Sequence, residues 1–203
     1  MPRLQKNLAT GVCQIEFELD AEEYAAIGRV MAQWAYLEHG LYEMSSGIAE
    51  IVGITLPEDA RSVSFSRRLR VLRDLVMTHA PDHERKRMIR LLDRIANVEQ
   101  DRHQVAHGTW DWEPSKPDLL RASCLRPSKT FEKLYDAKRI NRVADQIGQI
   151  SFELQYPGGW DEAFVDAISG GDETAESVAY ASVSRAFVRL MSQTPKAKGA
   201  SKG

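Results

Sequence analysis

The stretch DAEEYAAIGRVMAQWAYLEHGLYEMSSGIAEIVG, residues 20–53, decides the fold class. Asp20 and Glu23 have the spacing of a capping box, so a helix is expected to begin near Ala21. After this start, apolar residues recur at alternating steps of four and three, at Val30, Trp34, Leu37, Leu41, Met44, Ile48 and Ile51. Such a stripe stays on one face of a long helix and requires a partner helix to cover it. The stretch therefore predicts a helical bundle.

The remainder of the chain contains four further segments with helical spacing of apolar residues. These segments are residues 64–78, a stretch that opens at Pro81–Asp82 and ends at Gly108, and residues 132–154 and 173–191. After the third helix, Trp110 and Trp112 alternate with polar residues and 119–125 has the composition of a return strand, which predicts a β-hairpin. We therefore expect an all-α, up-and-down bundle of about five helices, with a short β-hairpin inserted after the third helix.

Length and composition suit one domain with two extensions. We expect an N-terminal arm at 1–19, a helical domain at 20–193 and a disordered basic tail at 194–203, which has no apolar anchor. The chain has no apolar run of the roughly 18 residues that a membrane span requires, and its N-terminus lacks the apolar core of a signal peptide. Its two cysteines are most simply free thiols. A cytoplasmic protein without a membrane partner is expected.

Basic residues gather in one part of the chain. Residues 61–103 carry 11 Lys and Arg against 6 Asp and Glu, whereas residues 1–60 carry 3 against 10. Candidate RNA-contacting residues in or just after this part are Arg67, Arg68, Arg70, Arg73 and Trp110. The arginines could instead form a solvated helix face, and the tryptophan could pack the hairpin rather than stack on a base.

Arg102 stands in line with the apolar stripe of the third helix, which contains Leu91, Ile95 and Val98. A buried guanidinium is costly unless a partner satisfies it. One interpretation is a structural role, either as an ion pair, for which Glu38 is a candidate partner, or as a side chain that snorkels to the surface near the helix end. The other is a cation held ready for a phosphate, which guanidinium binds in a bidentate manner.

His103 and His107 are four residues apart and share one helix face. Such a pair could hold a metal, but a third ligand is missing nearby in sequence and no Glu-x-x-His pair occurs, so no metal is expected. On an ideal helix Arg102 and His107 differ by about 140° and about 7.5 Å of rise. One copy is therefore expected to have difficulty bringing both to one phosphate, which favours a two-fold dimer.

The string RHQVAHGTW, residues 102–110, resembles the Arg-x-x-x-x-His motif of the HEPN superfamily, in which a polar residue, here His103, usually follows the arginine. The Trp-x-x-Leu-Glu sequence at 34–38 and the Arg-rich second helix extend the resemblance over roughly residues 20–155. The resemblance implies a metal-independent endoribonuclease that acts as a homodimer and cleaves RNA by 2′-OH attack. Arg102 would bind the phosphate, His107 would serve as acid or base, and His103 would orient or assist.

The resemblance also implies the kind of biological system in which the protein acts, and it leaves alternative functions open. Ribonucleases of this kind occur in toxin–antitoxin and phage-defence systems, so an antitoxin or another partner protein is a candidate partner. No cofactor is expected. The main alternative is a non-catalytic HEPN-like module that binds RNA, a nucleotide or a partner protein. A helical interaction protein without ligand chemistry is the third class.

Overall fold

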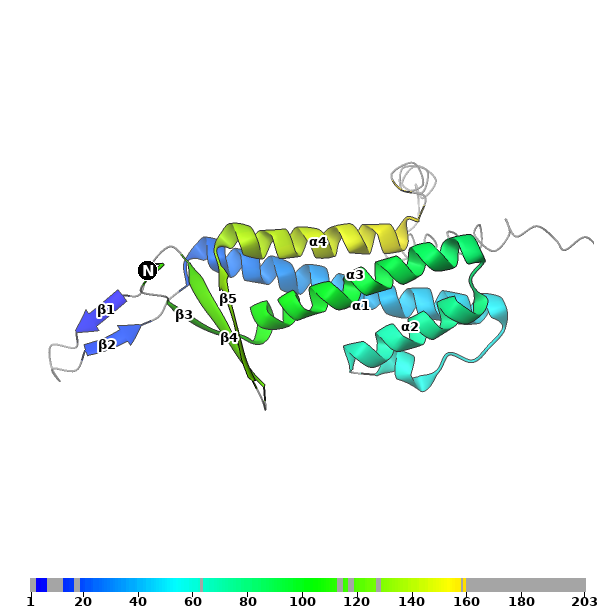
Figure 1. Ribbon diagram of the computed structural model, residues 1–203, viewed down its shortest axis with the longest axis horizontal. Coiled ribbons are helices and arrows are strands. Elements are labelled where there is room, and N and C mark those ends of the chain that lie inside the picture. The colour runs from blue at the N-terminus through cyan, green and yellow to red at the C-terminus, as the bar shows by residue number, and fades with distance from the viewer. Residues whose placement is uncertain are drawn as a thin grey trace, which may run out of the picture. The chain divides into compact units, whose positions relative to one another are not determined.

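The computed structural model describes residues 3–6, 13–16, 19–62, 64–112, 115–116, 119–126, 129–157 and 159. The described helices are α1 (Ala21–Val52), η1 (a 3-10 helix, Glu58–Arg61), α2 (Phe65–His79), α3 (Asp82–His107) and α4 (Ala137–Gln155) (Figure 1). The strands are β1 (Arg3–Lys6), β2 (Cys13–Glu16), β3 (Thr109–Trp112), β4 (Leu120–Arg126) and β5 (Lys129–Tyr135). Strands β1 and β2 form one antiparallel pair, and a second antiparallel sheet has the order β3-β4-β5. The fold is mainly α, as the sequence predicts.

The first three helices begin and end close to their predicted positions. The capping box forms in both directions, because the Asp20 N–H donates to Glu23 Oε2 (2.7 Å) and the Glu23 N–H donates to Asp20 Oδ1 (2.8 Å). The arm at 1–19 contains β1 and β2. The helix predicted at 173–191 and the tail predicted at 194–203 lie outside the described residues.

Two predictions for the region after α3 are wrong. The fourth helix starts at Ala137 rather than at residue 132, and the segment before it is strand β5. The expected two-stranded hairpin is thus a sheet of three strands. The physical reason is the cross-strand pairing of β5 with β4, in which Phe131 lies opposite Cys124 and Tyr135 opposite Leu120. These pairs place apolar side chains on one face at the two-residue period of a strand.

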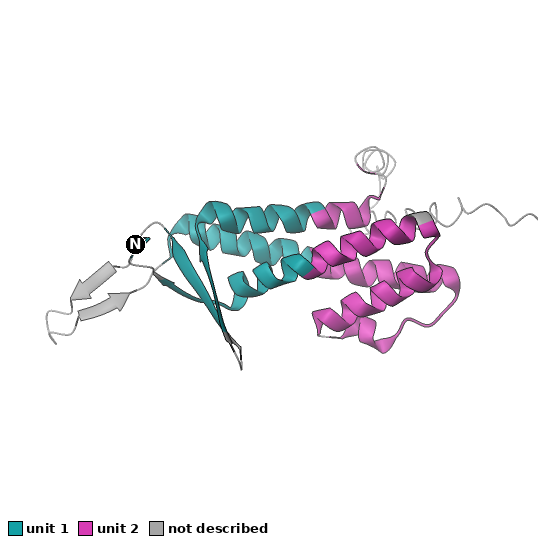
Figure 2. Ribbon diagram, in the orientation of Figure 1, with its two compact units in different colours: residues 1–36, 97–149 teal, residues 37–96, 150–203 magenta. Residues whose placement is uncertain are grey.

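The chain divides into two compact units (Figure 2). The first unit comprises residues 1–36 and 97–149, and the second comprises residues 37–96 and 150–203. Helices α1, α3 and α4 each contribute residues to both units. Each unit has its own buried apolar residues.

The core of the first unit lies where the beginning of α1, the end of α3, the sheet and α4 contribute side chains. Its buried residues include Val30, Trp34, Val105, Ala122, Tyr135, Ile140 and Ile147. At its surface, Arg29 of α1 joins α4 through Nη2, which lies 2.6 Å from Asp145 Oδ1, and through Nη1, which donates to Asn141. These contacts join the beginning of α1 to α4.

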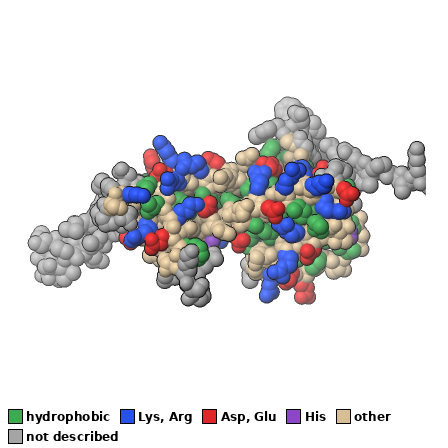
Figure 3. Space-filling view, in the orientation of Figure 1, with side chains coloured by type: hydrophobic (Ala, Val, Ile, Leu, Met, Phe, Trp, Pro, Cys, Tyr) green, Lys and Arg blue, Asp and Glu red, His purple; other side chains and the backbone are tan. Residues whose placement is uncertain are grey.

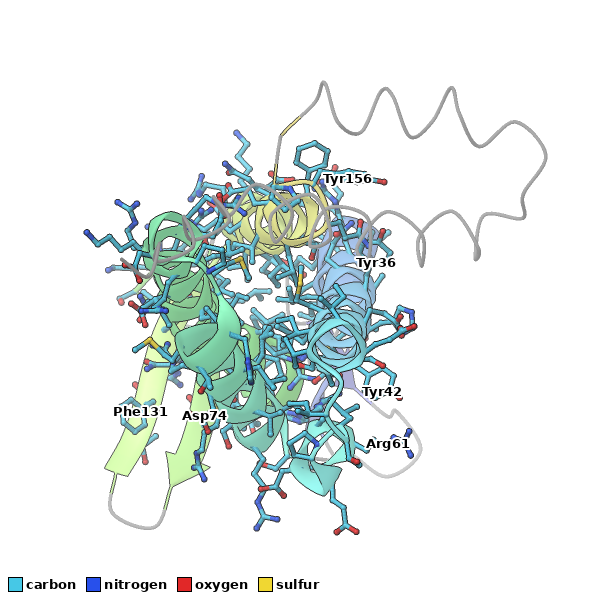
Figure 4. All side chains as sticks on the ribbon, turned by 90° about the vertical axis from the view of Figure 1, so that its right-hand side faces the viewer. Tyr36, Tyr42, Arg61, Asp74, Phe131 and Tyr156 are labelled. Atoms are coloured by element: carbon cyan, nitrogen blue, oxygen red, sulfur yellow. The ribbon has the colours of Figure 1, made fainter. Side chains whose placement is uncertain are left out.

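The second unit is built around α2 and the adjoining parts of α1 and α3. The predicted stripe of α2 is buried at Leu69, Leu72 and Val76. The guanidinium of Arg61 on η1 lies 6.0 Å from the ring centroid of Tyr42 on α1; both residues are labelled in Figure 4. Among the helices of the described residues, none is long and apolar enough to cross a membrane.

Gly108 ends α3 and lets the chain turn into β3. Its N–H donates to the Gln104 carbonyl (3.0 Å), which closes the last turn of the helix. A Cβ added at Gly108 would lie 2.4 Å from the Gln104 carbonyl oxygen and 3.2 Å from Ala122 Cβ of β4. Because backbone atoms on the helix and a buried residue on the sheet leave no space, this position requires glycine.

We predict that Gly108→Ala lowers the free energy of unfolding by about 1–3 kcal/mol, as overpacking typically does. Gly28→Ala is the matched control, because a Cβ there meets nothing within 4 Å and alanine favours the helix by about 0.5–1 kcal/mol. Urea unfolding of both variants measures the difference. Equal stability of Gly108→Ala and the unsubstituted protein would contradict the lack of space at Gly108 between the Gln104 carbonyl and Ala122.

Candidate functional site

Arg102 lies in the last turns of α3, over an aromatic ring of α1. Its Cζ is 5.0 Å from the ring centroid of Trp34, which is only 1% exposed. A buried ring cannot move away, so this cation–π contact fixes the guanidinium at the surface of the first unit. Burial of Trp34 also confirms that it belongs to the core stripe of α1.

No carboxylate among the described residues forms an ion pair with Arg102, and its buried Nε has no hydrogen-bond partner among them. The candidate partner Glu38 forms an ion pair with Arg68 of α2 in the second unit, at 2.9 Å. The described contacts thus argue against a structural ion pair of Arg102 with Glu38. A guanidinium with unused N–H groups is suited to bind an oxyanion.

Arg102 reaches His107 within the same chain. Its Nη1 lies 3.4 Å from His107 Nε2, although the two residues are five apart on the helix. The prediction that a single copy would have difficulty bringing both groups together is therefore wrong. The estimate from helical rotation and rise describes backbone positions and leaves out the length of the arginine side chain. His107 is also the last residue of α3, at the end of the regular helix. Convergence of the two side chains does not require a dimer.

The two histidines lie side by side at the end of α3. Their ring centroids are 5.0 Å apart, with the ring planes inclined at 53°. Arginine can only donate, so a hydrogen bond between the two side chains requires Nε2 of His107 as the acceptor. The site therefore combines a fixed cation with two neighbouring imidazoles.

The other basic candidates belong to the second unit. Arg67 lies 3.7 Å from Asp59, and Arg73 lies 2.6 Å from Asp93. Together with the Arg68 pair, these contacts give three of the four arginines a carboxylate partner, whereas Arg70 is exposed. On the face shown in Figure 3, basic and acidic side chains lie interspersed. The contacts favour a solvated, ion-paired helix face over a path for RNA.

Trp110 packs within the sheet. Its ring meets Tyr135 of β5 edge-on, with centroids 5.7 Å apart at 62°. Burial raises the pKa of Tyr135 well above its usual value, with smaller contributions from Asp101 and Cys124. Trp110 remains half-exposed, but its contact with a buried tyrosine favours packing over base stacking. The predicted packing role of Trp110 is consistent with this geometry.

Sequence reasoning missed Gln104, which lies between the two histidines. Its Nε2 donates to the carbonyls of Ala122 (3.0 Å) and Phe131 (3.2 Å), on β4 and β5. An ion pair also joins α3 to β5, with Lys133 Nζ 2.5 Å from Asp101 Oδ1. Residue spacing carries no signal for Gln104, because its partners are backbone groups on strands whose register only the fold defines.

The described residues hold no group of three or more His, Cys, Asp and Glu side chains that could bind a metal ion. No family model, curated protein or solved structure matches this chain. The resemblance to the HEPN superfamily therefore rests on the sequence motif, and the function has to be argued from the geometry of the site.

We predict that Arg102→Ala changes the free energy of unfolding by about 1 kcal/mol or less, because only the cation–π contact with Trp34 and the long contact with His107 are lost. Arg68→Ala is the comparison: it removes the half-buried ion pair with Glu38 and should cost about 1.5–3 kcal/mol. Urea unfolding measures both variants. A loss of about 3–5 kcal/mol for Arg102→Ala would show that the guanidinium is half of a buried ion pair.

Proposed function

We propose that this chain is a HEPN-like, metal-independent endoribonuclease. The observation that carries the proposal is the contact of Arg102 with His107: a guanidinium without a carboxylate partner among the described residues lies 3.4 Å from an imidazole nitrogen that can accept a proton. A cation that binds phosphate and a base that activates a hydroxyl are the two groups required for cleavage of RNA by its own 2′-OH.

The proposed reaction begins when a phosphate of RNA replaces His107 as the partner of Arg102. The guanidinium then neutralises the phosphate and the charge that develops on it during attack. His107 Nε2, released from Arg102, takes the proton of the ribose 2′-OH. The 2′-oxygen forms a bond to phosphorus while the bond to the 5′-oxygen breaks, which leaves a 2′,3′-cyclic phosphate. His103, whose ring lies beside that of His107, would orient it or would assist transfer of the proton that His107 has taken to the leaving 5′-oxygen.

The proposal includes the oligomeric state and the biological system that the resemblance implies. A homodimer is expected, although Arg102 and His107 already meet within one copy. We also propose that the domain is an up-and-down bundle of about five helices, of which the fifth is residues 173–191. An RNA substrate fits a cytoplasmic protein of a toxin–antitoxin or phage-defence system, with an antitoxin or other protein as partner.

We predict that Arg102→Ala lowers the rate of EDTA-resistant RNA cleavage by about 10²–10³-fold and that His107→Ala lowers it by about 10²–10⁴-fold. His103→Ala should have a milder effect, because its proposed role is to orient or assist. The assay follows cleavage of mixed RNA in EDTA and identifies the 3′ ends of the products. Melting temperatures are measured in parallel to separate catalysis from folding.

Arg142→Ala is the control for loss of a positive charge, since Arg142 is an exposed residue of α4. It should retain full activity. DNA of the same sequence should remain intact, because it lacks the 2′-OH. A folded wild-type protein that binds RNA without cleaving it would instead establish the non-catalytic binding module, and activity losses that merely follow the melting temperature would refute the assigned roles.

A further inference from the structure

The side chain of Gln104 fastens the last turn of α3 to the sheet. Its amide nitrogen donates one hydrogen bond to β4, at the Ala122 carbonyl, and another to β5, at the Phe131 carbonyl. One amide group thus uses both of its hydrogens on neighbouring strands. Hydrogen bonds are directional, whereas apolar contacts are not, so this pair fixes the rotation of the helix end as well as its distance from the sheet.

The position of Gln104 connects this attachment to His107. Gln104 lies three residues before His107, the last residue of α3, in a turn that would otherwise tend to fray. The chain continues through Gly108 into β3, where Trp110 is paired with Ala122 of β4. The bond from Gln104 to Ala122 therefore closes a ring that runs from the helix end through β3 and β4 back to the helix.

Arg102 has a different support. Its guanidinium lies over Trp34 of α1, whereas the turn that carries His107 is attached to the sheet. The two functional groups are therefore positioned by separate parts of the first unit. Their 3.4 Å separation depends on both supports, because a change at either one moves one group relative to the other.

We propose that Gln104 is a positioning residue for His107. It holds the last turn of α3 against β4 and β5, so that His107 Nε2 stays beside the phosphate that Arg102 binds. The kinetic consequence rests on the proposed ribonuclease function. The structural consequence, a fixed orientation of the His107 imidazole, can be measured without any catalysis.

The test compares Gln104→Met with Gln100→Met in the full-length protein. Methionine has nearly the helix propensity of glutamine but no amide hydrogens. Gln100 is an exposed residue of the same helix, so its substitution is the matched control. Long-range ¹H–¹⁵N spectra report the tautomer of His107, and cleavage of a random-sequence oligoribonucleotide in EDTA gives kcat and KM.

We expect Gln104→Met to lower kcat by about 10–100-fold with little change in KM, because misplacement by about 1 Å can cost about 10²-fold. The His107 spectrum should change from the tautomer that the contact with Arg102 selects to an average of both tautomers. Gln100→Met should change neither measurement. A native His107 spectrum in folded Gln104→Met would overturn the inference, as would full activity.

Two further outcomes remain decisive. If the wild-type protein cleaves no RNA, the proposed function fails, and the His107 spectrum alone decides whether Gln104 positions the imidazole. If Gln104→Met does not fold, Gln104→Lys replaces it, because an ammonium group can still donate to both carbonyls. A native His107 spectrum in Gln104→Lys supports the inference, and an averaged one in the folded variant overturns it.

Discussion

The contact of Arg102 with Trp34 is the interaction on which the candidate site depends. Trp34 is buried in the stripe of α1, so its ring offers a fixed apolar surface. The guanidinium stays on that surface although no carboxylate among the described residues pairs with it. The guanidinium therefore lies next to two imidazoles, and this is the geometry from which anion binding is proposed.

A second constraint acts at the other end of the site. Helix α3 is followed by Gly108, where a Cβ would lie 2.4 Å from the Gln104 carbonyl oxygen and 3.2 Å from Ala122 Cβ of β4, and the Gln104 side chain joins the same turn to two strands. The three-stranded sheet is therefore the support of the last helical turn. A rigid support matters because groups that act on one phosphate must keep their separation. Helix and sheet together place His107 beside Arg102.

The sequence predicted the helices well and the strands less well, for a physical reason. The capping box and the apolar stripe of α1 are local features, because both depend on residues three or four apart. Residues 132–135 also fit a helical pattern, yet they pair with β4 as a strand. Cross-strand partners are distant in sequence, so a short segment does not reveal whether a neighbouring strand will bind it.

By itself, the sequence determined the helical class, the limits of the first three helices and the identity of Arg102, His103 and His107 as candidates. Only the tertiary structure decided that Arg102 and His107 meet within one chain, that Glu38 pairs with Arg68 and that Gln104 holds the helix end. Helical periodicity follows the axis of the backbone, whereas these contacts depend on the reach of long side chains and on partners from other elements. Such contacts are defined by packing rather than by spacing along the chain.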